Sequence, residues 1–243
     1  MERPPGYLRA TRHPWPCLLF LLPLLAVYEG GVLWLGGTQA QIVRNGADAW
    51  LRWGLEVFGI TQLLAAPAIV VAILLVWSLR RWHERPADKL GICFGMALES
   101  ALFAFGLWAV SRNFGHLLEG LGIPLSQGTL PTDTLAQFVT FVGAGVYEEV
   151  LFRLILFGGL AMILRCAFLP AWQALPLAAV TAALLFAGAH HVGPYGEPMD
   201  PFRFLFRLAA GLYFTMLFWL RGFGIAVGAH AGYDVLVGVN WSG

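Results

Sequence analysis

Long apolar runs separated by short polar segments occupy most of the chain. A membrane-spanning helix needs about 20 apolar residues, so each run is a candidate span. The pattern predicts seven spans, at residues 15–35, 63–79, 90–110, 134–164, 170–191, 204–220 and 223–239. Residues 111–134, rich in Gly, Pro and Ser, are expected to form a loop, and residues 193–198 carry strong turn signals. The predicted fold is all-α, a polytopic transmembrane bundle forming one domain over residues 1–243.

One segment between the first two spans has a different pattern. Arg44, Asp48, Arg52 and Glu56 recur every four residues, so they share one face of a helix, and the apolar residues lie mostly on other faces. This pattern predicts an amphipathic helix over residues 41–58 that lies in the membrane interface. A solvated connecting helix explains the pattern equally well.

Composition agrees with a membrane solvent. Of the 243 residues, 58% are hydrophobic and 12% are charged, half the charge density of an ordinary soluble domain. The expected partners are therefore, first of all, membrane lipids. The net charge of +1 gives no reason to expect nucleic-acid binding. The sequence does not indicate an oligomeric state.

Arginine and lysine predict the orientation of the bundle. If the N-terminus is inside, nine lie on inner segments (Arg3, Arg9, Arg12, Arg80, Arg81, Arg85, Lys89, Arg165 and Arg221) and four on outer ones (Arg44, Arg52, Arg112 and Arg203). The positive-inside rule then predicts a cytoplasmic N-terminus. The near-exclusive use of arginine over lysine weakly favours a bacterial protein, and hence the bacterial inner (plasma) membrane.

Ionisable residues are concentrated in three of the last four predicted spans: Glu148, Glu149 and Arg153, then His190, then His230 and Asp234. Each such group costs roughly 2.5–3.5 kcal/mol at mid-membrane, so it is expected to face a polar interior. Glu149 and Arg153 share a helix face, as do His230 and Asp234, because each pair is four residues apart. Glu148 lies about 100° around the helix from Glu149 and can point elsewhere.

Helix geometry predicts which of these groups meet. The fourth and fifth spans form a hairpin around residues 165–170, which places Glu148 and His190 at similar depth. His190 lies near the end of its span, however, and His230 lies seven residues from the start of its own. Either a loop dips inward or one boundary is misplaced.

A stripe of small residues marks the last span. Gly224, Gly228 and Gly232 recur every four residues, and small residues at this spacing allow helices to pack closely. His230 lies about 200° from Gly228, so it is expected to point away from that contact and toward the polar interior.

Three short motifs resemble those of the CAAX protease and bacteriocin-processing enzyme family, also called the CPBP or Abi family. Residues 148–153 match E-E-x-x-x-R, residues 186–190 match F-x-x-x-H, and residues 230–234 match H-x-x-x-N/D. The resemblance covers about residues 136–238, within catalytic helices expected at 134–240. It implies an intramembrane endopeptidase, similar to the type II CAAX prenyl endopeptidases, that hydrolyses a peptide bond of a membrane-associated or lipidated substrate.

The resemblance also implies a role for each motif residue. Glu148 is expected to act as general base on a water molecule, His190 to hold the water and shuttle its proton, and His230 to donate to the oxyanion. Glu149 and Arg153 are expected to fix the helix and tune Glu148. Asp234 stands where the family has Asn or Asp; because an ionised carboxylate only accepts hydrogen bonds, it is expected to orient His230.

Several alternatives remain open. No cofactor is expected, but Glu148, His190 and His230 also form a two-histidine, one-glutamate set known from catalytic zinc sites. A non-catalytic scaffold or immunity protein would keep the same bundle, and a proton-coupled transporter would also bury acids and histidines. Two further acids, Glu29 and Glu99, are expected either to line the cavity or to hydrogen-bond neighbouring helices.

Overall fold

The computed structural model describes residues 6–37, 43–84, 86, 88–119, 134–193 and 196–238. Parts of the predictions lie outside the described residues: Arg3 and Arg85 of the orientation count, residues 41–42 of the amphipathic segment, 120–133 of the predicted loop, 194–195 of the turn, and 239–240 at the end of the last span and of the catalytic helices.

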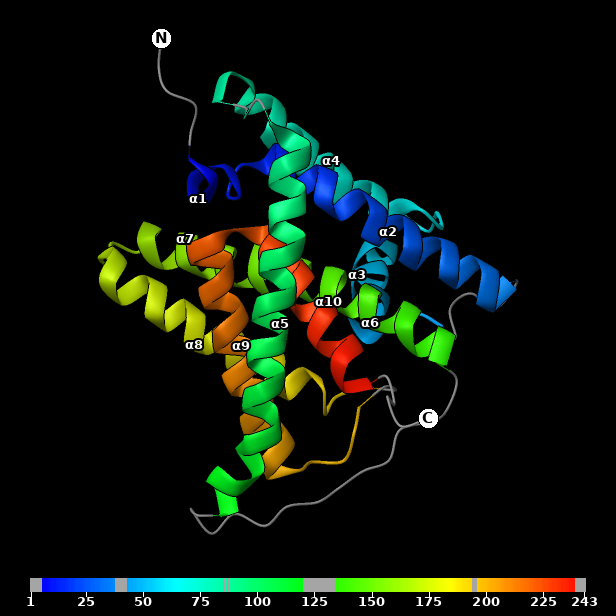
Figure 1. The fold of residues 1–243 in the computed structure, drawn as a ribbon, viewed down its shortest axis with the longest axis vertical. Coiled ribbons are helices and arrows are strands. Elements are labelled where there is room, and N and C mark those ends of the chain that lie inside the picture. Colours follow the sequence, from blue (N-terminus) through cyan, green and yellow to red (C-terminus); the bar gives the residue numbers. More distant parts are fainter. Residues whose placement is uncertain are drawn as a thin grey trace.

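Helices make up most of the described residues, among which there is no strand, and this confirms the all-α prediction (Figure 1). In order they are α1 Tyr7–Ala10, α2 Pro14–Gly36, α3 Gly46–Val57, α4 Ala65–Arg80, a 3₁₀ turn at Trp82–Glu84, α5 Lys89–Glu119, α6 Thr134–Glu149, a π-helical segment at Val150–Phe157, α7 Gly158–Cys166, α8 Ala171–Ala189, α9 Pro201–Arg221 and α10 Phe223–Gly238.

Each of the seven predicted spans corresponds to a helix or, for residues 134–164, to the continuous run of α6, the π-helical segment and α7. Four helices among the described residues are long and apolar enough to cross a membrane, namely α2, α5, α8 and α9, and α4 and α10 are shorter apolar helices. Large apolar side chains are exposed along these helices, for example Leu102 at 73% and Trp172 at 73%. The chain is an integral membrane protein whose apolar surface faces lipid.

The predicted loop at residues 111–134 is wrong in its first part. Helix α5 continues through Ser111 and Asn113 to Glu119. The two side chains bond to carbonyls on the preceding turn, Ser111 Oγ to Trp108 O at 2.8 Å and Asn113 Nδ2 to Ala109 O at 2.8 Å. These residue types favour loops because they compete for backbone bonds, but here they bond back to their own helix without ending it.

Helix α10 is packed between α5 and α6 (Figure 1). The glycine stripe makes the predicted close helix contact, and its partner in the structure is α5. A methyl group at Gly224 would lie 2.3 Å from Met96 Cε, one at Gly228 would lie 2.5 Å from Ser100 Oγ, and one at Gly232 would lie 3.1 Å from Ala104 Cβ. The stripe therefore brings α10 against three α5 residues that are themselves four apart.

A sharp turn at Gly222 connects α9 to α10. Its φ of 100° lies in a region that side chains disfavour. A Cβ atom there would also lie 2.9 Å from the carbonyl oxygen of Thr11. Glycine is required on both counts, and the turn lets α10 pass back along α9 without an intervening loop.

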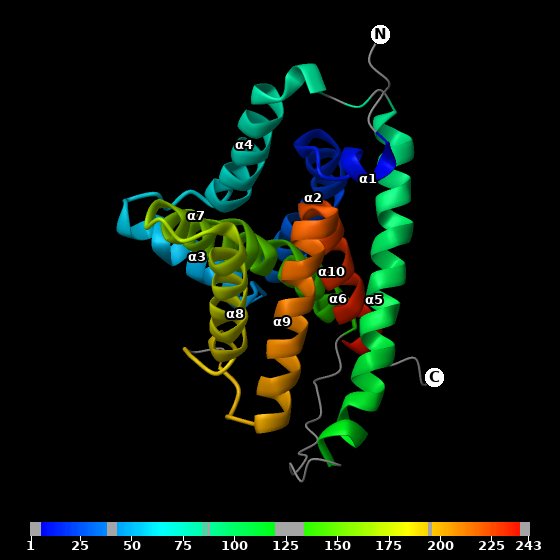
Figure 2. The same cartoon turned by 90° about the vertical axis from the view of Figure 1, so that its left-hand side faces the viewer.

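The conflict in depth between His190 and His230 is resolved by the segment after α8. Helix α9 begins beyond the end of α8 (Figure 2), and the chain between them folds back, so that Glu197 N donates to His190 O at 2.8 Å. The next residue, His191, therefore lies beside the first turn of α9, where its ring centroid is 6.2 Å from that of Phe204. This arrangement brings His190 to the level of His230.

Candidate active site

Residues from three helices meet around the Glu148 carboxylate. Its Oε2 lies 3.8 Å from His190 Nε2 and 3.8 Å from His230 Nε2. These distances are too long for direct hydrogen bonds, and they suit a water molecule bonded to all three groups. Glu148 Oε2 is buried and has no hydrogen-bond partner among the described residues. The predicted meeting of one carboxylate and two imidazoles is therefore present in the structure.

Glu149 points away from Glu148, as its position on the helix predicts, and binds two partners. Its Oε1 lies 2.9 Å from Arg153 Nη1 and 2.7 Å from His230 Nδ1. Glu149 is fully buried and Arg153 is 1% exposed. The sequence suggested that this pair would tune Glu148, but the hydrogen bond of Glu149 goes to His230, which fixes the orientation of that ring.

Asp234 lies on the opposite side of the same imidazole. Its Oδ2 is 3.6 Å from His230 Nε2, beyond hydrogen-bonding distance. Nε2 therefore faces both Glu148 and Asp234, and Nδ1 faces Glu149. Of the two carboxylates on either side of His230, the one that makes the orienting hydrogen bond is Glu149.

Aromatic rings hold the polar groups in place. Phe214 of α9 stacks on His230 with ring centroids 4.4 Å apart. Phe186 packs edge-on against His190 at 4.9 Å, and its carbonyl oxygen lies 2.8 Å from His190 Nδ1. The Arg153 guanidinium lies 4.5 Å from the Phe186 ring and 5.4 Å from the Phe214 ring. The sequence indicated Phe186 through its motif, but Phe214 had no signal beyond an apolar position in a span.

The helix changes its winding directly after the two glutamates. Val150–Phe157 forms a π-helical segment, and Gly158 N bonds to Arg153 O five residues earlier. Such segments are rare and recur at functional sites. The sequence had predicted one regular helix through this region, because apolar periodicity does not distinguish one additional residue in a turn.

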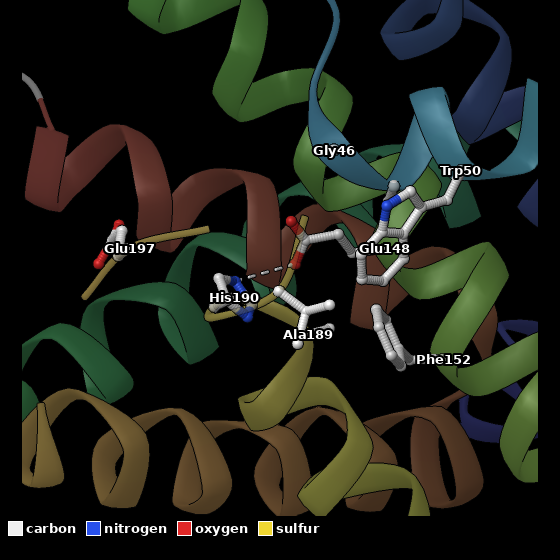
Figure 3. A pocket seen from close by; sticks show the side chains of 9 residues that line it. Gly46, Trp50, Glu148, Phe152, Ala189, His190 and Glu197 are labelled. Carbon is white, nitrogen blue, oxygen red and sulfur yellow. Dashed lines mark ion pairs between the residues drawn. The ribbon is translucent and has the colours of Figure 1, made fainter. Parts of the chain in front are cut away.

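A cavity of about 110 Å³ opens beside Glu148 and His190 (Figure 3). Besides these two, it is lined by Phe152, Ala189, Val192 and Glu197 from the same region of the chain. Its remaining wall comes from α3, through Gly46, Ala47 and Trp50. His230 and Asp234 are not among its lining residues, although His230 Nε2 lies 3.8 Å from the Glu148 carboxylate at its edge.

Glu197 closes one side of this cavity and is itself held by arginines of α9. Its carboxylate binds Arg203 Nη1 at 2.8 Å and Arg207 Nη2 at 3.0 Å. Partial burial raises the pKa of Glu197, but the hydrogen bonds from Arg207 and Arg203 reverse this and leave the pKa below its ordinary value.

The two remaining acids of the predicted spans hydrogen-bond neighbouring elements. Glu29 binds Arg44, Arg52 and Tyr147. Glu99 accepts from Tyr7 at 2.8 Å and from Arg221 Nη2 at 2.7 Å. Neither lines the cavity beside Glu148, so of the two expectations for these residues the structural one applies.

Comparison with protein families identifies the C-terminal part of the chain. Residues 130–236 match the model of the family described as "Type II CAAX prenyl endopeptidase Rce1-like". Residues 130–236 belong to the CAAX protease family. The match includes all three motifs and ends two residues after Asp234, while α1 to α5 lie outside it. Comparisons with curated proteins and with solved structures found no match.

Proposed function

We propose that this CAAX protease family member is an intramembrane endopeptidase that hydrolyses a peptide bond of a membrane-associated or lipidated substrate. The observation that carries the proposal is the equal 3.8 Å separation of Glu148 Oε2 from two imidazole Nε2 atoms on different helices. A carboxylate and an imidazole that share one water can remove its proton as the water attacks a carbonyl carbon.

In this mechanism, Glu148 takes the proton from the water and His190 holds the water in place. The hydroxide forms a tetrahedral intermediate, whose oxyanion accepts a hydrogen bond from His230 Nε2. This role requires a proton on both nitrogens of His230, because Nδ1 also donates to Glu149. The C–N bond of the intermediate then breaks as the proton passes from Glu148 through His190 to the leaving amine nitrogen, and the C=O bond re-forms as a carboxyl group. Glu149 and Arg153 act as positioning residues, because they reach the reaction through His230.

The substrate site is expected to lie in the cavity between α3 and the catalytic helices. Its walls are apolar at Ala47, Trp50, Phe152 and Val192, and polar at Glu148 and His190. A prenylated CAAX tail, a leader peptide and a juxtamembrane segment all provide an extended peptide beside lipid, and a bacterial source would favour the latter two.

Zinc chemistry is the alternative use of the same three side chains. A tetrahedral ion with ligands at 2.0–2.1 Å keeps its donor atoms about 3.4 Å apart, whereas the carboxylate and imidazole atoms here are 3.8 Å apart. No group of three or more ligand-type residues in the described chain stands in metal-holding geometry. The side chains would have to close in to hold an ion, so we favour the metal-free mechanism, in which a strong chelator leaves activity unchanged.

The proposal is tested by comparing membranes that contain the wild type, Glu148→Gln or His190→Ala. Glu56→Gln is the matched control, because this glutamate is exposed on α3. Mass spectrometry should detect peptides cut by the wild type and the control, with cleavage about 10²–10⁴-fold slower in Glu148→Gln, since it loses the base. Equal cleavage by all four proteins would refute the mechanism.

A further inference from the structure

Helix α3 lies outside the family-matched segment and packs against α6, the helix that carries Glu148 (Figure 1). The amphipathic pattern predicted this helix but did not indicate which face would meet the bundle. The charged face does so, since Trp53 is 68% exposed and Val57 67% exposed, whereas Asp48 is fully buried. Charged side chains are therefore enclosed between α3 and the rest of the bundle.

A buried ionic network joins α3 to α2. Arg44 and Arg52 both bind Asp48, and the same two arginines reach Glu29 of α2 at 3.1 and 3.3 Å. These four residues carry two positive and two negative charges and are at most 7% exposed. Buried ion pairs contribute little net stability, because the cost of desolvating the charges offsets their attraction. The value of this network therefore lies in the geometry that it fixes.

Tyr147 of α6 connects the network to the proposed base. Its OH donates to Glu29 Oε1 at 2.6 Å, and the residue is fully buried. Tyr147 directly precedes Glu148 in the chain. The backbone that carries the base is therefore tied to a charged cluster outside the family-matched segment.

The two neighbours of Glu148 hold α6 from nearly opposite sides. Successive residues of a helix are about 100° apart, so Tyr147 and Glu149 are about 200° apart around the axis, with Glu148 between them. Tyr147 binds Glu29 on α2, and Glu149 binds His230 on α10 at 2.7 Å. Together these two hydrogen bonds fix the rotation of α6 and the direction of the Glu148 carboxylate.

The helix alone does not fix this rotation, because its winding changes at Val150, directly after the two glutamates. If the π-helical segment closed to ordinary α-helical winding, the residues before it would rotate by roughly 100° relative to those after it. The residues after it are held elsewhere: Arg153 Nη2 bonds to Gly211 O at 3.3 Å. Such a rotation would therefore fall on Glu148 and carry it away from the two imidazoles.

We propose that Tyr147 is a positioning residue for the Glu148 base, and that the Glu29–Arg44–Asp48–Arg52 network is the fixed support to which Tyr147 bonds. This inference rests on the proposed peptidase function. It gives α2 and α3, which the family match does not include, a part in aligning the catalytic centre.

The test compares Tyr147→Phe with Tyr28→Phe, because each removes one hydroxyl from the same cluster and keeps the ring. The two rings pack with centroids 5.3 Å apart, and both residues are fully buried. Tyr28 OH donates to Asp48 Oδ2 at 2.9 Å and accepts from Asn45 N at 3.2 Å. Tyr28→Phe therefore removes two hydrogen bonds, one of them from a buried backbone N–H, and should lower Tm at least as much as Tyr147→Phe.

Activity should follow the opposite order. We measure kcat and KM for the full-length protein in detergent micelles, at equal folded amount, with a synthetic peptide that spans a cleavage site found in membranes. Tyr147→Phe should lower kcat about 10- to 100-fold with KM nearly unchanged, because a misplacement of about 1 Å costs up to about 10²-fold in rate. Tyr28→Phe, whose hydroxyl does not bond to α6, should keep kcat within about threefold of the wild type.

A double-mutant cycle with Glu148→Gln is the second measurement. A residue that acts through the base has no further effect once the base is absent, so Tyr147→Phe/Glu148→Gln should cut the peptide as fast as Glu148→Gln alone. A purely structural role of Tyr147 would instead lower the rate by the same factor in both backgrounds.

The outcomes separate the two proposals. If cleavage depends on Glu148 but Tyr147→Phe keeps the wild-type kcat, lowers it no more than Tyr28→Phe, or acts equally in both backgrounds, the positioning role is wrong and the peptidase function stands. If Glu148→Gln cuts as well as the wild type, or if the wild type cuts no peptide, the peptidase function is wrong and the positioning role is lost with it.

Discussion

The Glu149–Arg153 pair allows a test in which stability and activity respond differently. Substitution of Glu149 by Gln removes the negative charge and leaves the Arg153 guanidinium, 1% exposed, without its carboxylate. Breaking a buried pair from one side costs about 3–5 kcal/mol. For a chain of this size that corresponds to a fall in Tm of roughly 6–20 °C.

The double variant Glu149→Gln/Arg153→Met is expected to recover most of this loss, because it removes both charges and keeps an apolar side chain between Phe186 and Phe214. Cleavage should stay low in both variants, since each lacks the Glu149 carboxylate that accepts the hydrogen bond from His230 Nδ1. Thermal unfolding in detergent measures the first quantity, and cleavage by the proteins at equal folded amount measures the second.

The exposed Glu56→Gln serves as control and should leave both quantities unchanged. A double variant as unstable as the single one would show that the guanidinium is not held mainly by Glu149. Full cleavage by either variant would show that His230 does not need this carboxylate.

The other predictions concern packing and pH. Gly145→Ala should destabilise the bundle by about 1–3 kcal/mol in a thermal melt, because its Cβ would lie 2.6 Å from the backbone nitrogen of Ala231. Gly159→Ala is the control and should leave the stability unchanged, because the space around Gly159 is open. Glu197 has a lowered pKa, so its ion pairs are fully present above the unfolded pKa of about 4.3 and are lost as pH falls through the lower folded value. The rate of amide hydrogen exchange in residues 196–200, corrected for the intrinsic rate, should therefore rise below about pH 4. The Glu197→Gln variant should show this raised exchange rate already at neutral pH. An unchanged exchange rate in that variant would contradict the role of the ion pair with Arg207.

Local periodicity was sufficient to predict the helices and much of the site. Spacings of four residues correctly paired Glu149 with Arg153, and hairpin depth correctly brought Glu148 to His190. The glycine stripe predicted a close helix contact, which the structure provides at α5. These features depend on the spacing of residues within one helix or between two consecutive helices, and that spacing can be read from the sequence.

Features that depend on distant parts of the chain could not be predicted. The charged stripe on α3 fits a solvated face and a buried one equally, and only the position of Glu29 on another helix decides between them. The hydrogen bond of Glu149 to His230 likewise joins residues 81 positions apart. The cavity wall at Trp50 had no signal at all, because an aromatic residue on an amphipathic helix is ordinary in a membrane protein.

The π-helical segment after Glu149 has a consequence for how the surfaces of this helix are assigned. Before it, the core-facing residues Val146, Tyr147 and Glu149 are fully buried. After it, α7 has no buried residue, and Met162 and Ile163 are 64% and 61% exposed. A single helical wheel with 3.6 residues per turn, drawn through residues 134–166, would therefore assign the buried face correctly before the π-helical segment and incorrectly after it. The wider turn resets the angular phase, so that a single continuous rod presents polar residues near its middle and a lipid-facing surface at its C-terminal end.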